Sequence, residues 1–200
     1  MALLELIGLR SRLAGPFDLR LEAGECVAIT GASGAGKSLF LRLIADLDPG
    51  DGEVLLNGRE RRSWAPPAWR RQVLYNAAEP GWWAARVREH FPGSALARAR
   101  EMAPLLDLQL GLLDAPVLQL STGERQRMAL IRALAVEPPV LLLDEPTGAL
   151  DQDSTALVEE MLAERLAGGT AILMVTHNPE QARRVGSRRA QMVARRLVFA

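Results

Sequence analysis

The stretch "ECVAITGASGAGKSLFLRL", residues 25–43, contains a strand pattern, a glycine-rich loop and a helix pattern in direct succession. The apolar run over 25–30 is typical of a strand that is buried on both faces of a parallel sheet. The loop over 31–38 has the form G-x-x-x-x-G-K-[ST] and lies between a strand and a helix, as that motif requires. The stretch therefore predicts an α/β core that carries a phosphate-binding loop, or P-loop.

The residue types of this loop suit the binding of a nucleotide. Its glycines let the backbone turn N–H groups toward phosphate oxygens, and the dipole of the following helix adds positive potential. Lys37 is the only lysine in the chain, and its compact ammonium fits between β- and γ-phosphates where the planar fork of an arginine does not. A turn built for packing alone would leave this single lysine unexplained. The predicted nucleotide contacts are Gly31, Ala32, Ser33, Gly34, Ala35, Gly36, Lys37, Ser38 and Leu39, with Ser38 also a ligand of Mg²⁺.

Composition narrows the class of protein. A chain of 200 residues with 48% hydrophobic residues is long enough for one domain with a real core. The formal charge is zero, so no overall basic field attracts nucleic acid, and we expect no nucleic-acid partner. A single cysteine, Cys26, in an apolar run indicates a reducing compartment. Six arginines near the C-terminus are interpreted as a solvated face: Arg183, Arg184, Arg188, Arg189, Arg195 and Arg196.

The rest of the chain alternates between strand and helix patterns. The runs "PVLLLD" (139–144) and "TAILMVT" (170–176) resemble the strand of the opening stretch, and each precedes a helix pattern. Short antiparallel strands separated by glycine turns are expected before and after the P-loop. We predict one domain over 1–200, in which 1–79 and 139–200 form the core with a β layer and 80–138 form a helical subdomain.

Polar side chains follow both of these further strands. Asp144 and Glu145 end the first one, and His177 follows the second. Because the carboxyl ends of parallel strands lie at one edge of a sheet, these side chains are expected near the P-loop. Asp144 would join Ser38 in holding Mg²⁺, and Glu145 would deprotonate an attacking water. Each residue alone could be ordinary polar capping, but their joint position at the ends of strands favours a site.

One further stretch carries a family resemblance: "QLSTGERQRMALIRALAVEPPVLLLDEPTGALD", residues 119–151. It resembles the signature-through-D-loop region of ATP-binding cassette (ABC) ATPases. Locally, Ser121 and Glu124 also form the pattern of a capping box at a helix start. The resemblance covers almost the whole chain, because the P-loop at 31–38 and His177 also stand in the matching order.

The resemblance implies an ATPase that uses ATP and Mg²⁺. Glu145 would be the general base, while His177 and Lys37 would position the γ-phosphate. Two copies would pair head to tail, so that each ATP lies between the P-loop of one copy and Ser121 and Gly123 of the other. Asp151 would join the dimer interface.

The resemblance also implies a partner. The chain looks like a stand-alone subunit that energises a separately encoded membrane permease, peripheral to the cytoplasmic face of the plasma (inner) membrane. Its length and its LS-x-GE signature are most similar to small bacterial cassettes associated with metal, particularly iron, export. All four tryptophans lie between residues 64 and 83. Trp64 and Trp69 are interpreted as packing residues, and Trp82 or Trp83 as a permease contact.

Several positions depart from the family pattern. Ala78 stands where the family has a glutamine that helps sense Mg²⁺ and water and couples the site to the transporter. Leu13 stands where an aromatic residue stacks on adenine, and Phe17 is only a weak substitute. In the signature, Thr122 replaces the first glycine and Glu124 replaces a glutamine. These departures predict weaker coupling and looser adenine selectivity.

Two other functions remain open from the sequence. One is a soluble ABC ATPase without a permease, although such proteins usually carry a long coiled-coil insertion or a second cassette. The other is a regulatory nucleotide-binding subunit with weak turnover, which Ala78 favours and Glu145 with His177 disfavours. Beyond the similarity to metal-export cassettes, no feature of the sequence identifies the transported substrate or its direction.

Overall fold

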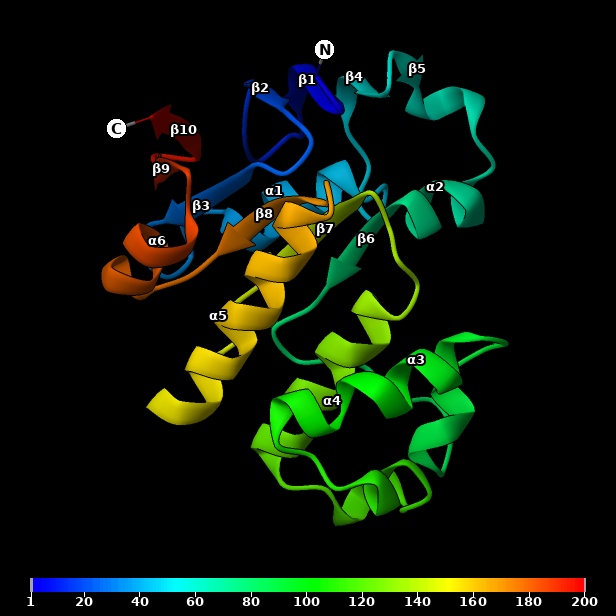
Figure 1. Cartoon of the computed structure of the whole chain (residues 1–200). Coiled ribbons are helices and arrows are strands. Elements are labelled where there is room, and N and C mark those ends of the chain that lie inside the picture. The colour runs from blue at the N-terminus through cyan, green and yellow to red at the C-terminus, as the bar shows by residue number, and fades with distance from the viewer. Residues whose placement is uncertain (1, 200) are drawn as a thin grey trace.

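The apolar runs form a six-stranded sheet in the order β10-β9-β3-β8-β7-β6. We describe residues 2–199 of a computed structural model (Figure 1). All neighbouring pairs in this sheet are parallel except β9 with β10. Its strands are β3 (Cys26–Thr30), β6 (Val73–Asn76), β7 (Val140–Asp144), β8 (Ala171–Val175), β9 (Arg188–Val193) and β10 (Arg196–Phe199).

The central strands bury both faces, because alternate side chains point to opposite sides of a strand. On β3, Val27 and Ile29 join one hydrophobic cluster, whereas Cys26 and Ala28 join another. The first cluster contains α1 (Lys37–Ile44), and the second contains side chains of α5 (Gln152–Ala167) and α6 (Pro179–Val185). Helices therefore cover the parallel sheet on both sides.

A second, antiparallel sheet packs on the far side of α1, with the order β2-β1-β4-β5. Its strands are β1 (Leu4–Arg10), β2 (Phe17–Leu21), β4 (Asp51–Leu56) and β5 (Arg59–Glu60). Burial alternates along β2, where Phe17 meets Phe40 of α1 with ring centroids 4.6 Å apart. The predicted β layer is therefore present, and the Phe17 side chain is buried in the core.

The stretch expected to be helical lies at the opposite end of the molecule from the β layer (Figure 1). It contains two α-helices, α3 (Ala95–Met102) and α4 (Thr122–Leu134), and otherwise short turns. The turns are 3₁₀ helices: η2 (Val87–His90), η3 (Pro104–Leu106), η4 (Leu110–Leu113) and η5 (Val117–Gln119). None of the helices described within residues 2–199 is long and apolar enough to cross a membrane.

The C-terminal end of α1 is held by side chains from the segment after the β layer. There, η1 (Arg61–Ser63) and α2 (Pro66–Gln72) place Arg61 and Trp69 against the helix end. Arg61 Nη1 donates to the Leu43 carbonyl at 2.6 Å, and Trp69 Nε1 donates to the Ile44 carbonyl at 3.0 Å. Because the last carbonyls of a helix have no partner within it, these two bonds complete the helix end.

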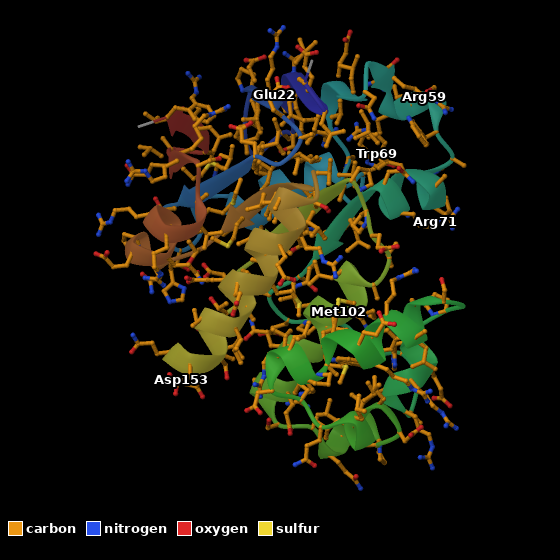
Figure 2. All side chains as sticks on the ribbon, viewed as in Figure 1. Glu22, Arg59, Trp69, Arg71, Met102 and Asp153 are labelled. Atoms are coloured by element: carbon orange, nitrogen blue, oxygen red, sulfur yellow. The ribbon has the colours of Figure 1, made fainter. Side chains whose placement is uncertain are left out.

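Figure 2 shows Trp69 inside the molecule, whereas Arg59, Arg71 and Asp153 lie at its rim. The indole is fully buried, and its ring centroid lies 6.3 Å from that of Trp64. The interpretation of Trp69 as a packing residue agrees with this position.

Substitution Trp69→Phe removes the buried donor to Ile44 and leaves a small void. We expect the free energy of unfolding to fall by about 2 kcal/mol or more, because a buried carbonyl loses its partner and contacts are lost. Urea denaturation measures this change. The matched control is Trp83→Phe, since the Trp83 side chain is exposed. Equal destabilisation by both substitutions would contradict the role given to Trp69.

Candidate functional site

The P-loop joins the end of β3 to the start of α1. Gly31 has φ of +149°, and a Cβ at this position would lie 2.7 Å from the Met192 carbonyl oxygen, so only glycine fits. Gly36 stands at the N-cap of α1 with φ of +101°. The first N–H groups of α1 have no helical partners, and the positive end of the helix faces the loop. This backbone is suited to an anion.

Lys37 extends across the loop. Its Nζ donates to the Gly31 carbonyl at 2.8 Å and to the Ala32 carbonyl at 3.0 Å. Within residues 2–199, no ion pair with a carboxylate is recorded for Lys37. The ammonium therefore rests on neutral carbonyls, and its charge is available to a bound phosphate.

Asp144 ends β7 and is almost fully buried. Tyr75 lies on the neighbouring strand β6, and its hydroxyl donates to Asp144 Oδ2 at 2.9 Å. Burial and the adjacent carboxylate raise the pKa of Tyr75 above its ordinary value, so the phenol remains a donor. This bond occupies one carboxylate oxygen and fixes the orientation of the other.

Glu145 and His177 are in direct contact. Glu145 Oε2 lies 2.7 Å from His177 Nδ1 and accepts the His177 backbone N–H at 3.1 Å. Because a carboxylate only accepts hydrogen bonds, the ring nitrogen facing it carries the proton. Glu145 has φ of +48°, a left-handed conformation that is uncommon outside glycine and that occurs often at functional sites. The pair therefore joins the ends of β7 and β8.

These elements surround a cavity of about 390 Å³, called the phosphate cavity because the P-loop forms part of its wall. The residues that line it are Leu13, Ser33, Gly34, Gly36, Lys37, Ser38, Leu39, Ala78, Asp144, Glu145 and Arg195. Most of the predicted P-loop contacts and both predicted acids thus meet at one edge of the sheet. Ala78, in the position of the expected glutamine, also lies on this wall.

Other predicted site residues lie outside the cavity. Gly31, Ala32 and Ala35 belong to the P-loop but do not line it. His177 does not line the cavity but contacts Glu145, which does, and 71% of the His177 side chain is exposed. Neither Ser121 nor Gly123 lines it; they belong to the start of α4.

The start of α4 is a capping box, as the sequence predicts. Ser121 Oγ accepts the Glu124 N–H at 3.2 Å, and Glu124 Oε2 accepts the Ser121 N–H at 2.7 Å. The bonds from Ser121 lower the pKa of the Glu124 carboxyl group. One turn further on, Gln126 donates to the Glu145 carbonyl at 2.8 Å and accepts the Ala149 N–H at 2.9 Å. The helix is therefore tied to the backbone that carries Glu145.

Sequence reasoning missed two residues of this site, Tyr75 and Arg195. Tyr75 is the only tyrosine of the chain, but no local pattern places it beside Asp144, because that position depends on the pairing of β6 with β7. Arg195 is exposed, as the prediction of a solvated face requires, but its side chain also lines the phosphate cavity. Its position depends on the pairing of β9 with β3, which no local pattern reveals.

The chain matches the family described as "ABC transporter" over residues 15–148. The chain belongs to the ABC transporter family. A solved structure of an ATP-binding subunit of an ABC transporter superposes with a TM-score of 0.86 at 27% identity, over 99% of this chain and 89% of that one. The predicted fold and the predicted ABC-type ATPase domain are therefore confirmed.

The curated relatives are named for different transported substrates. The chain is 35% identical to the probable iron export ATP-binding protein FetA of Escherichia coli, over 86% of this chain and 80% of that protein. It is 36% identical to the lipoprotein-releasing system ATP-binding protein LolD of Idiomarina loihiensis, over 84% and 82%. It is 36% identical to the methionine import ATP-binding protein MetN of Latilactobacillus sakei, over 90% of this chain but only 57% of that protein. These names do not single out metal export.

Substitution Tyr75→Phe tests the hydrogen bond to Asp144. We expect the Mg²⁺ concentration for half-maximal ATP hydrolysis to rise by about tenfold, since loss of a partner that orients a metal ligand weakens metal binding by this order. Hydrolysis rates measured against Mg²⁺ at constant ATP give this value. Binding of ATP in excess chelator serves as the control and should be unchanged. An unaltered Mg²⁺ requirement would contradict a role for Tyr75 in orienting Asp144.

Proposed function

We propose that this chain is the ATP-binding and ATP-hydrolysing subunit that energises a separately encoded membrane permease. The observation that carries the proposal is the single cavity lined by Lys37, Ser38, Asp144 and Glu145. A phosphate loop, a hydroxyl, a buried carboxylate and a second carboxylate together match the requirements of phosphoryl transfer to water. The membership of the chain in the ABC transporter family supports the same activity.

The donor set in the cavity fits Mg²⁺. The Ser38 hydroxyl and the Asp144 carboxylate are oxygen ligands, and Mg²⁺ commonly takes one or two protein oxygens together with waters and phosphate oxygens. When bound, Mg²⁺ neutralises charge that develops on the β- and γ-phosphates. Because the Tyr75 hydroxyl donates to one oxygen of Asp144, the other oxygen remains available to bind Mg²⁺.

The roles of the remaining residues follow from their contacts. Lys37 rests on two carbonyls beside the loop amides and would exchange these contacts for phosphate oxygens. Glu145 Oε2 is held by His177, which leaves Oε1 to accept a proton from the attacking water. The Nδ1 of His177 is engaged in that hydrogen bond, so Nε2 would be the nitrogen that contacts the γ-phosphate.

A second copy of the chain would complete the site. The capped start of α4 is exposed at Ser121 and does not reach the phosphate cavity of its own chain. Helix starts bind anions, so a head-to-tail dimer would place Ser121 and Gly123 on the phosphates held by the partner. A solved structure of a dimeric bacterial ABC transporter cassette, with a TM-score of 0.83 and 25% identity, supports the pairing of two copies. Asp151 caps α5, and the preceding Leu150 lies beside Gly123, since its Cδ2 is 3.5 Å from the position that a Cβ on Gly123 would take.

The surface around Trp83 is the proposed permease contact. The Trp83 side chain is 71% exposed, and its ring packs 4.5 Å from that of His90. The guanidinium of Arg132 lies over both Trp82 and Trp83, at 4.7 and 4.8 Å from the ring centroids. A groove of about 340 Å³ beside it is lined by Ala78, Glu79, Pro80, Trp82, Thr122, Arg125, Gln126 and Ala149. Of the two predicted tryptophans, Trp83 is therefore the better anchor, since rigid exposed aromatic rings favour interfaces.

For the cargo we propose metal ions moved outward across a bacterial inner membrane, with this chain on the cytoplasmic face. The support is the LS-x-GE signature together with a relative named for iron export. Relatives named for other cargo match at similar identity, so transport assays with the permease must include those cargo classes.

Substitution Glu145→Gln tests the proposed chemistry. The variant should bind ATP normally but hydrolyse it about 100-fold or more slowly, because the proton acceptor is lost. It should also accumulate as an ATP-bound dimer in size-exclusion chromatography. The control Glu164→Gln makes the same change on an exposed part of α5 and should leave both properties unaltered. Near-normal turnover of Glu145→Gln would mean that another residue activates the water.

Substitution Ala78→Gln tests whether the missing glutamine weakens coupling. Ala78 lines both the phosphate cavity and the groove beside Trp82, so a longer polar side chain there can contact metal-bound water. We expect higher ATPase activity, or stronger stimulation by the permease, at saturating Mg-ATP.

The competing explanation is that a neighbour has taken over this role. Asn76 is buried at the end of β6, and Glu79 lines the adjacent groove. If Asn76→Ala or Glu79→Ala lowers activity while Ala78→Gln gives no gain, the site has been rebuilt and weakened coupling is refuted. That result would also remove the main argument for a regulatory subunit with weak turnover.

A further inference from the structure

Arg195 occupies the tip of the hairpin between β9 and β10. Val193 pairs with Arg196, so Ala194 and Arg195 form a two-residue turn. Because β9 runs parallel to β3, this turn lies at the same sheet edge as the P-loop. The hairpin thus brings the C-terminal strands to the wall of the phosphate cavity, and Arg195 lines it.

The backbone of this turn is unfavourable for its residues. Ala194 has φ of +46° and Arg195 has φ of +62°, the left-handed values that such hairpins usually satisfy with asparagine and glycine. An arginine here costs conformational free energy that glycine would avoid. Residues kept in such conformations are concentrated at functional sites, which directs attention to the Arg195 side chain.

The Arg195 side chain crosses the P-loop and ends on the β1–β2 loop. Its Cγ lies 3.6 Å from the position that a Cβ on Gly36 would take. Its Nη1 donates to the Leu13 carbonyl at 2.8 Å, and its own carbonyl accepts the Gly15 N–H at 3.1 Å. No ion pair of Arg195 is recorded within residues 2–199, so no carboxylate cancels its charge.

A nucleotide whose phosphates lie at the P-loop can extend its base along this wall. Leu13 and Leu39 line the phosphate cavity and also a neighbouring cavity of about 850 Å³. Two polar side chains on that second cavity are already engaged: Ser11 Oγ accepts two backbone N–H groups, and Asp48 accepts two bonds from Arg42. Arg12 and Asp51 also line this cavity and are exposed. A base at the junction of the two cavities would meet the aliphatic side chains of Leu13 and Leu39, with the Arg195 guanidinium beside them on the phosphate-cavity side.

We propose that the guanidinium of Arg195 stacks on the face of the nucleotide base and replaces the aromatic residue that Leu13 lacks. The anchor on Leu13 holds the guanidinium at the base end of the cavity, whereas Lys37 is held at the carbonyls of Gly31 and Ala32. A planar cation binds the π-face of a base without reading its edge. The inference rests on the proposed function of this cavity.

The test compares ATP with inorganic tripolyphosphate, which offers phosphates without a base. Substitution Arg195→Gly suits the left-handed turn, so the melting temperature should not fall. We expect the variant to bind ATP about tenfold more weakly, the usual order for one lost stacking contact, and to bind tripolyphosphate within about twofold of the original affinity. Calorimetry or displacement of a labelled nucleotide measures both affinities.

Arg196→Ala is the matched control, because Arg196 is exposed on β10 and lines neither cavity. It should leave both affinities unchanged. Unaltered ATP binding by Arg195→Gly, or equal losses for ATP and tripolyphosphate, would overturn the proposal, since the second result means that Arg195 contacts phosphate.

Substitution Lys37→Ala separates this proposal from the one it rests on. It should abolish binding of both ligands, because it removes the phosphate contact. If Lys37→Ala binds both ligands normally, the assignment of the cavity itself fails. If Lys37→Ala loses both and Arg195→Gly loses neither, only the role of Arg195 is wrong.

Discussion

The parallel pairing of β6, β7, β8, β3 and β9 is the constraint on which the rest of the structure depends. It forces the carboxyl ends of all five strands to one edge, although they are far apart in the sequence. The P-loop, the two acids at the end of β7, His177 and the β9–β10 turn reach the same place for this reason alone. The strands themselves are buried on both faces, which makes this register costly to change.

Hydrogen bonds then tie this edge to the rest of the molecule. Gln126 binds the backbone of Glu145 and of Ala149, so the capped helix α4 cannot shift without moving the carbonyl beside the proposed base. Glu145 in turn holds His177. The groove beside Trp82 adjoins the same helix, so a partner docked there would act on the site through packed, hydrogen-bonded elements.

The sequence was sufficient for those features that are encoded locally. The strand, glycine loop and helix around Lys37, the acids at the end of β7 and the capping box at Ser121 each lie within one short stretch, and all are present in the structure. Tyr75 and Arg195 were not predicted in the site because their positions depend on strand pairing. The stretch over 80–138 was expected to be mainly helical, but much of it forms 3₁₀ turns, whose short-range bonds leave no periodic pattern.

The central claim is that the edge of the parallel sheet holds the triphosphate and its metal. A crystal structure of the Glu145→Gln variant with ATP and Mg²⁺ tests it most directly. The account predicts phosphates against the loop amides and Mg²⁺ about 2.1 Å from Ser38 Oγ, with the Asp144 carboxylate beside it. Phosphates in the larger cavity next to Asp48, or a metal remote from both Ser38 and Asp144, would contradict the account.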